Sequence, residues 1–169
     1  MRVSQILMMM VEESQGSLHD VEHFLKVYAY AGAIGREEGL DPQVQQTLEI
    51  AALLHDIACP QCRAKYGSAI PRRQEEEGEV LARQLLARAQ LPQDQVERVA
   101  YLVGHHHTLS LVDGPDYQIL LEADYLVNAG ESHYPQEDIR RAYHQWFKTR
   151  AGRRLLQALY GPIPEDESR

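Results

Sequence analysis

The sequence predicts an all-α fold, and three observations carry that prediction. Apolar residues recur at spacings of three and four along most of the chain, which is the period of one face of a helix. Proline and glycine divide these stretches into segments of helical length, and no convincing run shows the alternation typical of a strand. With 169 residues, 44% of them hydrophobic, the chain has the size of one compact domain, 1–169.

The first three helices are expected within residues 1–55. Apolar residues from Ile6 to Val11 predict a first helix that ends near Gly16. Ser17 is a candidate N-cap for a second helix, which Gly39 stops. Asp41 followed by Pro42 predicts the capped start of a third helix that runs to His55.

Residues 59–73 hold Pro60, Gly67 and Pro71 among polar residues and predict a long loop. Further helices are expected at about 74–89, 92–105, 117–128, 136–148 and 153–160, which gives seven to eight helices in all. The last nine residues, 161–169, are expected to be a frayed tail.

Composition excludes several classes of function. A formal charge of −8 and a pI near 5.4 argue against a nucleic-acid binder, because that binding needs many lysines and arginines. The N-terminus lacks the layout of a signal peptide, and no apolar run approaches the ~20 residues of a membrane span. Two cysteines cannot form a disulfide framework, so we expect a cytoplasmic protein without a membrane partner, and homodimer formation stays open.

Histidines and carboxylates beside apolar runs are the candidate site residues. His23 lies on the second expected helix, His55 and Asp56 end the third, and Asp124 lies in a nearly continuous apolar stretch. A single residue of this kind is usually solvent-facing or paired with a counter-charge. Three helices that each present one favour a divalent metal site between helices, and a carboxylate on an apolar face needs a cation.

His23, the pair His55-Asp56 and the later Asp124 occur in the order H…HD…D, within HDVEHFLKVYAYA, AALLHDIA and ILLEADYLVNAG. This pattern resembles the HD superfamily of metal-dependent phosphohydrolases, over about residues 17–130, with C-terminal helices at about 136–160. The resemblance implies an HD-domain-like helical bundle in which these four residues coordinate one metal. Neutral imidazole and carboxylate ligands suit Mn, Fe, Co, Ni or Zn. Asp56 is then the candidate catalytic residue.

A second metal or a phosphate contact is expected near the histidine run 105–107. Two-metal relatives place histidines there, which makes His105 and His106 candidates, and His19 lies one turn before His23. The relatives also open an H-x-x-x-G phrase in the preceding helix, and here Gln74 stands where that histidine would be. The plain alternative for the run is a polar helix end.

Residues after the HD pair bear on the reaction. Some relatives keep an acidic residue three positions after the aspartate, whereas this chain has Cys59. Either metal-bound hydroxide with Asp56 suffices, or the base comes from elsewhere, such as Glu75, Glu76 or Glu77. Cys59 and Cys62 form a CxxC without a second pair or a thioredoxin-like context, and we interpret them as incidental. Cations that could bind substrate phosphate, or simply face solvent, are Lys65, Arg72 and Arg73.

The sequence therefore predicts a metal-dependent phosphohydrolase for a small phosphorylated metabolite, such as a nucleotide or related phosphoester. A phosphomonoesterase or nucleotide pyrophosphohydrolase fits better than a cyclic-dinucleotide phosphodiesterase, since no GYP follows the histidine run. The alternative is a regulatory nucleotide- or phosphate-binding HD module without catalysis, which the missing acidic residue at Cys59 favours.

Overall fold

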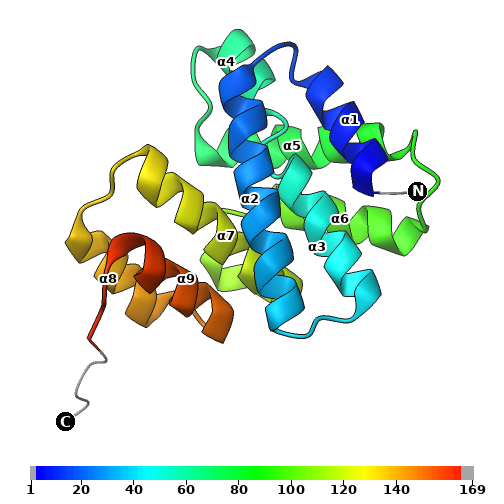
Figure 1. Cartoon of the computed structure of the whole chain (residues 1–169). Coiled ribbons are helices and arrows are strands. Elements are labelled where there is room, and N and C mark those ends of the chain that lie inside the picture. Colours follow the sequence, from blue (N-terminus) through cyan, green and yellow to red (C-terminus); the bar gives the residue numbers. More distant parts are fainter. Residues whose placement is uncertain (1–2, 165–169) are drawn as a thin grey trace.

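Every regular element in the part of the chain that the computed structural model describes, residues 3–164, is a helix. The expected all-α fold is thereby confirmed (Figure 1). The predicted frayed tail, 161–169, lies outside the described residues from position 165 onward. The helices are α1 (Val3–Glu13), α2 (Leu18–Glu37), α3 (Pro42–Leu54), α4 (Cys59–Tyr66), α5 (Pro71–Leu86), α6 (Gln93–His105), the 3-10 turn η1 (Leu109–Leu111), α7 (Pro115–Glu131), α8 (Gln136–Gln145) and α9 (Arg150–Tyr160).

The boundaries of α2 and α3 follow from their capping residues. Gly39 has a φ of +73°, a left-handed conformation that glycine adopts without strain, and it separates the two helices. The Asp41 side chain accepts a hydrogen bond from the Gln43 backbone N–H at 2.9 Å, as an N-cap should. Ser17 occupies the N-cap position of α2, but its hydroxyl contacts the Asp20 carboxylate rather than a backbone N–H.

The long loop predicted at 59–73 is wrong, because residues 59–66 form the helix α4. Pro60 lies in the first turn of α4, where its missing N–H costs no hydrogen bond, and Gly67 ends the helix with a φ of +73°. The next helix also begins earlier than expected, at Pro71. The residues that signalled a loop are therefore the start and stop signals of helices.

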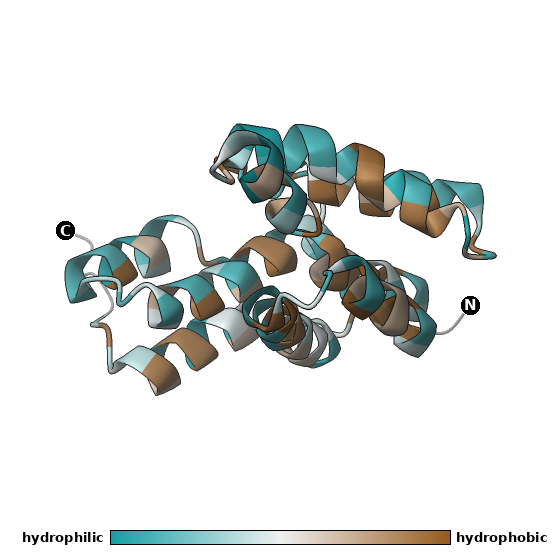
Figure 2. Cartoon of the chain, turned by 90° about the horizontal axis from the view of Figure 1, so that it is seen from above, coloured by the Kyte–Doolittle hydropathy of each residue, from teal (hydrophilic) through white to brown (hydrophobic). Residues whose placement is uncertain are grey.

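Helix α3 lies in the centre of the fold and packs against α1, α2, α6 and α7. All of its residues from 47 to 54 are buried, which its run of apolar and small side chains allows. The other helices carry short hydrophobic and hydrophilic bands along their length, as expected where one face of each meets the core (Figure 2). The centre of the bundle thus holds the end of α3 rigidly in the interior.

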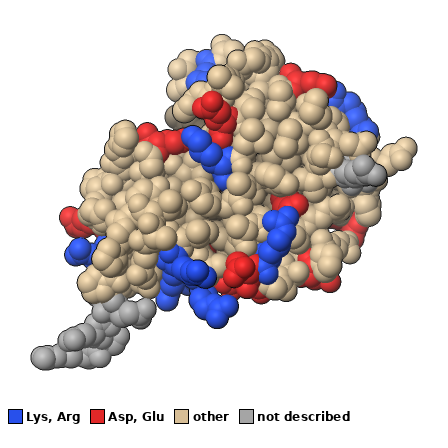
Figure 3. All heavy atoms as spheres, viewed as in Figure 1, with Lys and Arg blue, Asp and Glu red and all other residues tan. Residues whose placement is uncertain are grey.

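Helices α8 and α9 extend the bundle beyond α7 (Figure 1). Phe147, in the link between them, is almost fully buried and packs against Tyr125 of α7. On the face drawn in Figure 3, basic side chains lie beside acidic ones at several places. Within residues 3–164, none of the helices is apolar over enough of its length to span a bilayer.

Candidate metal centre

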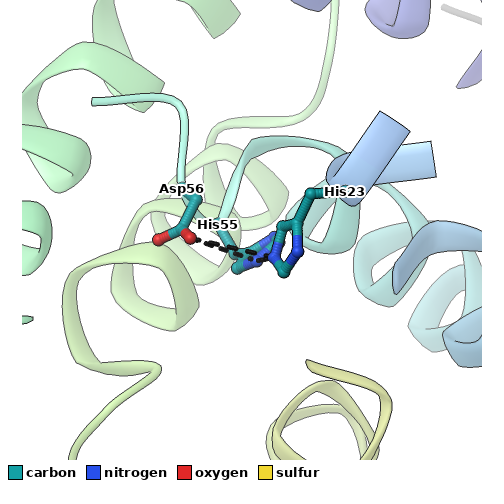
Figure 4. Close-up of side chains that lie close together, drawn as sticks. All are labelled: His23, His55 and Asp56. Atoms are coloured by element: carbon teal, nitrogen blue, oxygen red, sulfur yellow. Dashed lines mark hydrogen bonds and ion pairs between the residues drawn. The ribbon is translucent and has the colours of Figure 1, made fainter. Parts of the chain in front are cut away.

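Three helices bring the four predicted ligands together. His23 lies on the buried face of α2, His55 and Asp56 follow the last turn of α3, and Asp124 lies on α7. Since α2, α3 and α7 pack against one another, side chains on their facing surfaces meet in the interior. Figure 4 shows His23, His55 and Asp56 pointing toward one another.

The ligand atoms of these residues converge on one point. His23 Nε2 and His55 Nε2 are 3.1 Å apart, and Asp124 Oδ1 lies 3.3 Å from the first and 3.4 Å from the second. Asp56 Oδ2 lies 3.9 Å and 3.8 Å from the same two nitrogens. His23, His55 and Asp124 are buried, so water does little to solvate this cluster.

The hydrogen bonds around the two histidines leave lone pairs facing each other. His55 Nδ1 lies 2.9 Å from the carbonyl oxygen of Ala52, and His23 Nδ1 lies 2.8 Å from Glu131 Oε2. Both partners only accept, so each Nδ1 carries the hydrogen, and each neutral ring presents a bare Nε2 to the centre. Two nitrogen lone pairs and two carboxylates in one buried place need a cation, and this donor set fits a divalent transition metal.

The carboxylates of the cluster favour a positive group among them. Burial lowers the pKa of His23, but Asp124, Glu131 and Asp56 outweigh it and raise that pKa to about 9. Burial raises the pKa of Asp124, yet hydrogen bonds with His23 and His55 hold it well below its ordinary value. Without a metal ion, a proton on His23 therefore supplies the positive charge.

Asp56 connects this centre to a second group formed with His106 and His107. Its Oδ1 lies 3.1 Å from His106 Nε2, and His106 Nδ1 is held by the carbonyl oxygen of Val103 at 2.8 Å. Burial lowers the pKa of His106, but Asp56 raises it overall, whereas burial and the neighbouring His106 lower the pKa of His107 to about 4. The second group offers one carboxylate and two imidazoles, fewer ligands than the first.

Both groups open into a cavity of about 760 Å³, which Asp56, Asp124, His106 and His107 line on one side. Gln74 also lines it, and its Oε1 lies 2.6 Å from His107 Nε2. The glutamine that replaces a histidine in the Q-x-x-x-G phrase thus lies beside the second group. A cavity of this size takes a small metabolite.

Other predicted site residues lie away from the cavity. His105 stacks on Tyr101 with ring centroids 4.4 Å apart and shares its Nδ1 hydrogen with that residue's carbonyl oxygen. His19 is exposed on α2. Lys65 pairs with Glu77 at 2.8 Å and Arg72 pairs with Glu76 at 2.8 Å, both at the surface.

Arg73, the third predicted phosphate-binding cation, lies over the ring of Tyr66 with its guanidinium carbon 3.8 Å from the ring centre. None of the three cations lines the cavity. The cations that do line it are Arg141 on α8 and Lys148 in the link to α9.

The candidate bases are also engaged elsewhere. Glu75 accepts hydrogen bonds from the His107 backbone and the Thr108 hydroxyl, and Glu77 accepts one from the Tyr66 hydroxyl at 2.6 Å. Glu76 is paired with Arg72 at the surface. Cys59 and Cys62 are buried free thiols, and burial together with Asp56 raises the pKa of Cys59 far above the neutral range.

Sequence reasoning missed Glu131 and Asn128, which support the ligands from α7. Asn128 donates a hydrogen bond to Asp124 Oδ1 at 2.8 Å, and Glu131 holds His23. Asp124, Asn128 and Glu131 are spaced four and three residues apart, so they lie on one helix face. This spacing of polar residues around Asp124 was the available signal.

Comparisons with known proteins agree with this geometry. The family model of the HD domain matches residues 20–129, more than half of the chain and all four converging residues. The chain also resembles the crystal structure of a predicted HD superfamily hydrolase from an uncultured Thermotogales bacterium, with a TM-score of 0.69 and 26% identity over 93% of this chain and 84% of that one. None of the curated proteins compared with the chain matches it. The chain belongs to the HD-domain family.

Proposed function

We propose that the protein is a metal-dependent phosphohydrolase for a small phosphorylated metabolite. The substrate is a nucleotide or related phosphoester, and the reaction is that of a phosphomonoesterase or nucleotide pyrophosphohydrolase. The observation that carries the proposal is the convergence of two imidazoles and two carboxylates from three helices beside a cavity of metabolite size. The family of the chain supports it.

His23, His55, Asp56 and Asp124 are the proposed ligands. A divalent transition metal bound there lowers the pKa of water and neutralises charge that develops on a phosphate. The chain fixes its two imidazoles through Glu131 and the Ala52 carbonyl, so the ligands are oriented before any ion arrives.

Asp56 is the proposed catalytic residue. One of its carboxylate oxygens faces the two histidines, and the other lies within hydrogen-bond distance of His106 Nε2 at the cavity wall. Asp56 and His106 are together placed to take a proton from the attacking water and to return one to the oxygen that leaves phosphorus. Asp56 and His106 thus take the place of Glu75, Glu76 and Glu77, which lie outside the cavity.

The cations that line the cavity are Arg141, which also pairs with Glu137 and Asp138, and Lys148. We therefore place the interaction with further substrate phosphate or hydroxyl groups on these residues rather than on Lys65, Arg72 and Arg73. The small-molecule cavity remains the basis for expecting a metabolite rather than a nucleic acid as the partner.

The alternative function is a regulatory module that binds a nucleotide or phosphate without hydrolysing it. Cys59 favours this alternative, because it stands where some relatives keep an acid, and its buried thiol stays protonated at neutral pH.

A substrate panel screened with several metals separates the two functions. Protein loaded with Mn, Fe, Co, Ni or Zn is incubated with nucleotides and other phosphorylated metabolites, and phosphate or pyrophosphate release is measured. We expect turnover that the His55→Ala/Asp56→Ala double variant loses. If no compound is hydrolysed while a nucleotide raises the melting temperature, the regulatory function holds instead.

A further inference from the structure

Aromatic side chains line part of the cavity. Tyr125, Tyr134 and Trp146 are among the lining residues. Tyr125 is at the centre, with ring centroids 5.5 Å from Tyr134 and 5.7 Å from Trp146, both in edge-to-face orientation. The buried ring of Phe147 backs Tyr125 at 5.7 Å. The rings support one another, so their orientations are fixed by packing.

Two of these rings keep free surface. Trp146 is 39% exposed and Tyr134 is 36% exposed, although both lie against a well-packed cluster. Partly exposed aromatic residues that line a concave site are typical of ligand pockets, where they stack on a flat, apolar group.

The aromatic wall, made of Tyr125, Tyr134 and Trp146, lines the same cavity as Asp56 and Asp124 of the metal centre. Tyr125 directly follows Asp124 on α7 and lies within the match to the HD domain. Tyr134 and Trp146 lie beyond residue 129, where that match ends. The cavity therefore combines ligands from the family domain with a wall to which the C-terminal segment of this chain adds two rings.

We propose that Tyr134 and Trp146 form a subsite for a planar aromatic ring that the substrate carries on its phosphoester. With the phosphate at the His/Asp cluster and Arg141 and Lys148 beside the cavity, the ligand class is a nucleoside phosphate. The phosphate end of this inference rests on the proposed function. The binding of a planar ring rests only on the positions of Tyr134 and Trp146.

The known strength of base stacking on an aromatic side chain predicts how much affinity is lost when one ring of the subsite is removed. Loss of one such contact reduces affinity about 5- to 150-fold. For Trp146→Ala we expect a loss in that range in kcat/KM for nucleoside 5′-monophosphates, mainly through KM. Ribose 5-phosphate, which has the same phosphoester without the base, should change by less than about twofold.

Two further variants control the measurement. Trp146→Phe keeps an aromatic ring and should retain most of the activity toward nucleotides. Tyr28→Ala removes a partly buried aromatic side chain of α2 that does not line the cavity, and it should leave the preference for nucleotides over ribose 5-phosphate unchanged. Equal losses on both substrates in Trp146→Ala would overturn the subsite.

A binding measurement separates failure of the subsite from failure of the proposed function. Trp146 is the single tryptophan of the chain, so its fluorescence reports on this wall alone. In chelator-treated wild-type protein, adenosine 5′-monophosphate should change that fluorescence and ribose 5-phosphate at the same concentration should not. A fluorescence change without any hydrolysis overturns the phosphohydrolase and keeps the subsite, whereas hydrolysis of both compounds with unchanged fluorescence does the reverse.

Discussion

Replacing Glu131 by alanine is expected to weaken metal binding without unfolding the protein. Glu131 Oε2 accepts the 2.8 Å hydrogen bond that turns His23 Nε2 toward the other ligands. Removal of such a carboxylate from a ligating histidine lowers metal affinity about 10- to 100-fold. Stability of the metal-free protein should fall by about 1–3 kcal/mol, because the charge-assisted hydrogen bond to His23 is lost, whereas the exposed ion pair with Lys26 adds little.

The size of the loss depends on pH, because His23 also binds a proton. With a pKa of about 9, the metal-free His23 weakens apparent metal binding about 100-fold at pH 7, since the proton must leave first. Alanine at position 131 removes one cause of that raised pKa, so the variant loses less to proton competition. The loss of metal affinity in Glu131→Ala relative to wild type should therefore be largest near pH 9 and smaller near pH 7.

Competition with a chromophoric chelator measures this deficit across the pH range. Lys26→Ala is the matched control, because it removes the other partner of Glu131 and leaves the hydrogen bond to His23. We expect this control to bind metal within about threefold of wild type. Wild-type affinity in Glu131→Ala, or an equal loss in Lys26→Ala, would refute the role given to Glu131.

Three further predictions follow from the same geometry. Asp124→Ala should lose stoichiometric metal yet keep its helical circular dichroism, since the remaining ligands lie on helices packed by their own apolar faces; full metal content in elemental analysis would contradict this. Metal binding near pH 7 should release about one proton, from His23, as measured by calorimetry in buffers of different ionisation enthalpy. In the metal-free protein, the charged His23 ring should stabilise the fold fully below pH 6.5, and this stabilisation should disappear as pH rises through about 9. Arg141→Ala should raise KM for the substrate at least threefold, while alanine at Lys65, Arg72 or Arg73 should change KM less than twofold. A larger rise in KM for these three variants than for Arg141→Ala would show that the residues predicted from sequence bind the phosphate.

The sequence could predict the ligand set because its pattern is local to each helix. His23, His55 and Asp124 each stand beside an apolar run, and burial of such a run carries the polar residue into the interior with it. The resemblance of the ordered motifs to the HD superfamily then implied which of these residues would meet. The structure adds the distances and the supporting hydrogen bonds, which no spacing rule contains.

Other parts could not be predicted because they depend on tertiary contacts. Side chains of consecutive residues in a helix point about 100° apart. The sequence alone could therefore not tell that, at the end of α6, His106 and His107 line the cavity while His105 stacks on Tyr101. Lys65 lay close to the HD pair in sequence, but the unrecognised helix α4 carries it to the surface beside Glu77. The aromatic wall joins Tyr125 of α7 with Tyr134 and Trp146, which come before and after α8, so it exists only once these segments pack together.

The most direct test of the account is a crystal structure of the protein soaked in Mn²⁺, with the ion located by its anomalous scattering. We expect a peak among His23 Nε2, His55 Nε2, Asp56 Oδ2 and Asp124 Oδ1, with ligand distances of about 2.0–2.2 Å after the side chains close on the ion. A fully loaded crystal with no peak at these four atoms, or with its strong peak among other residues, would contradict it.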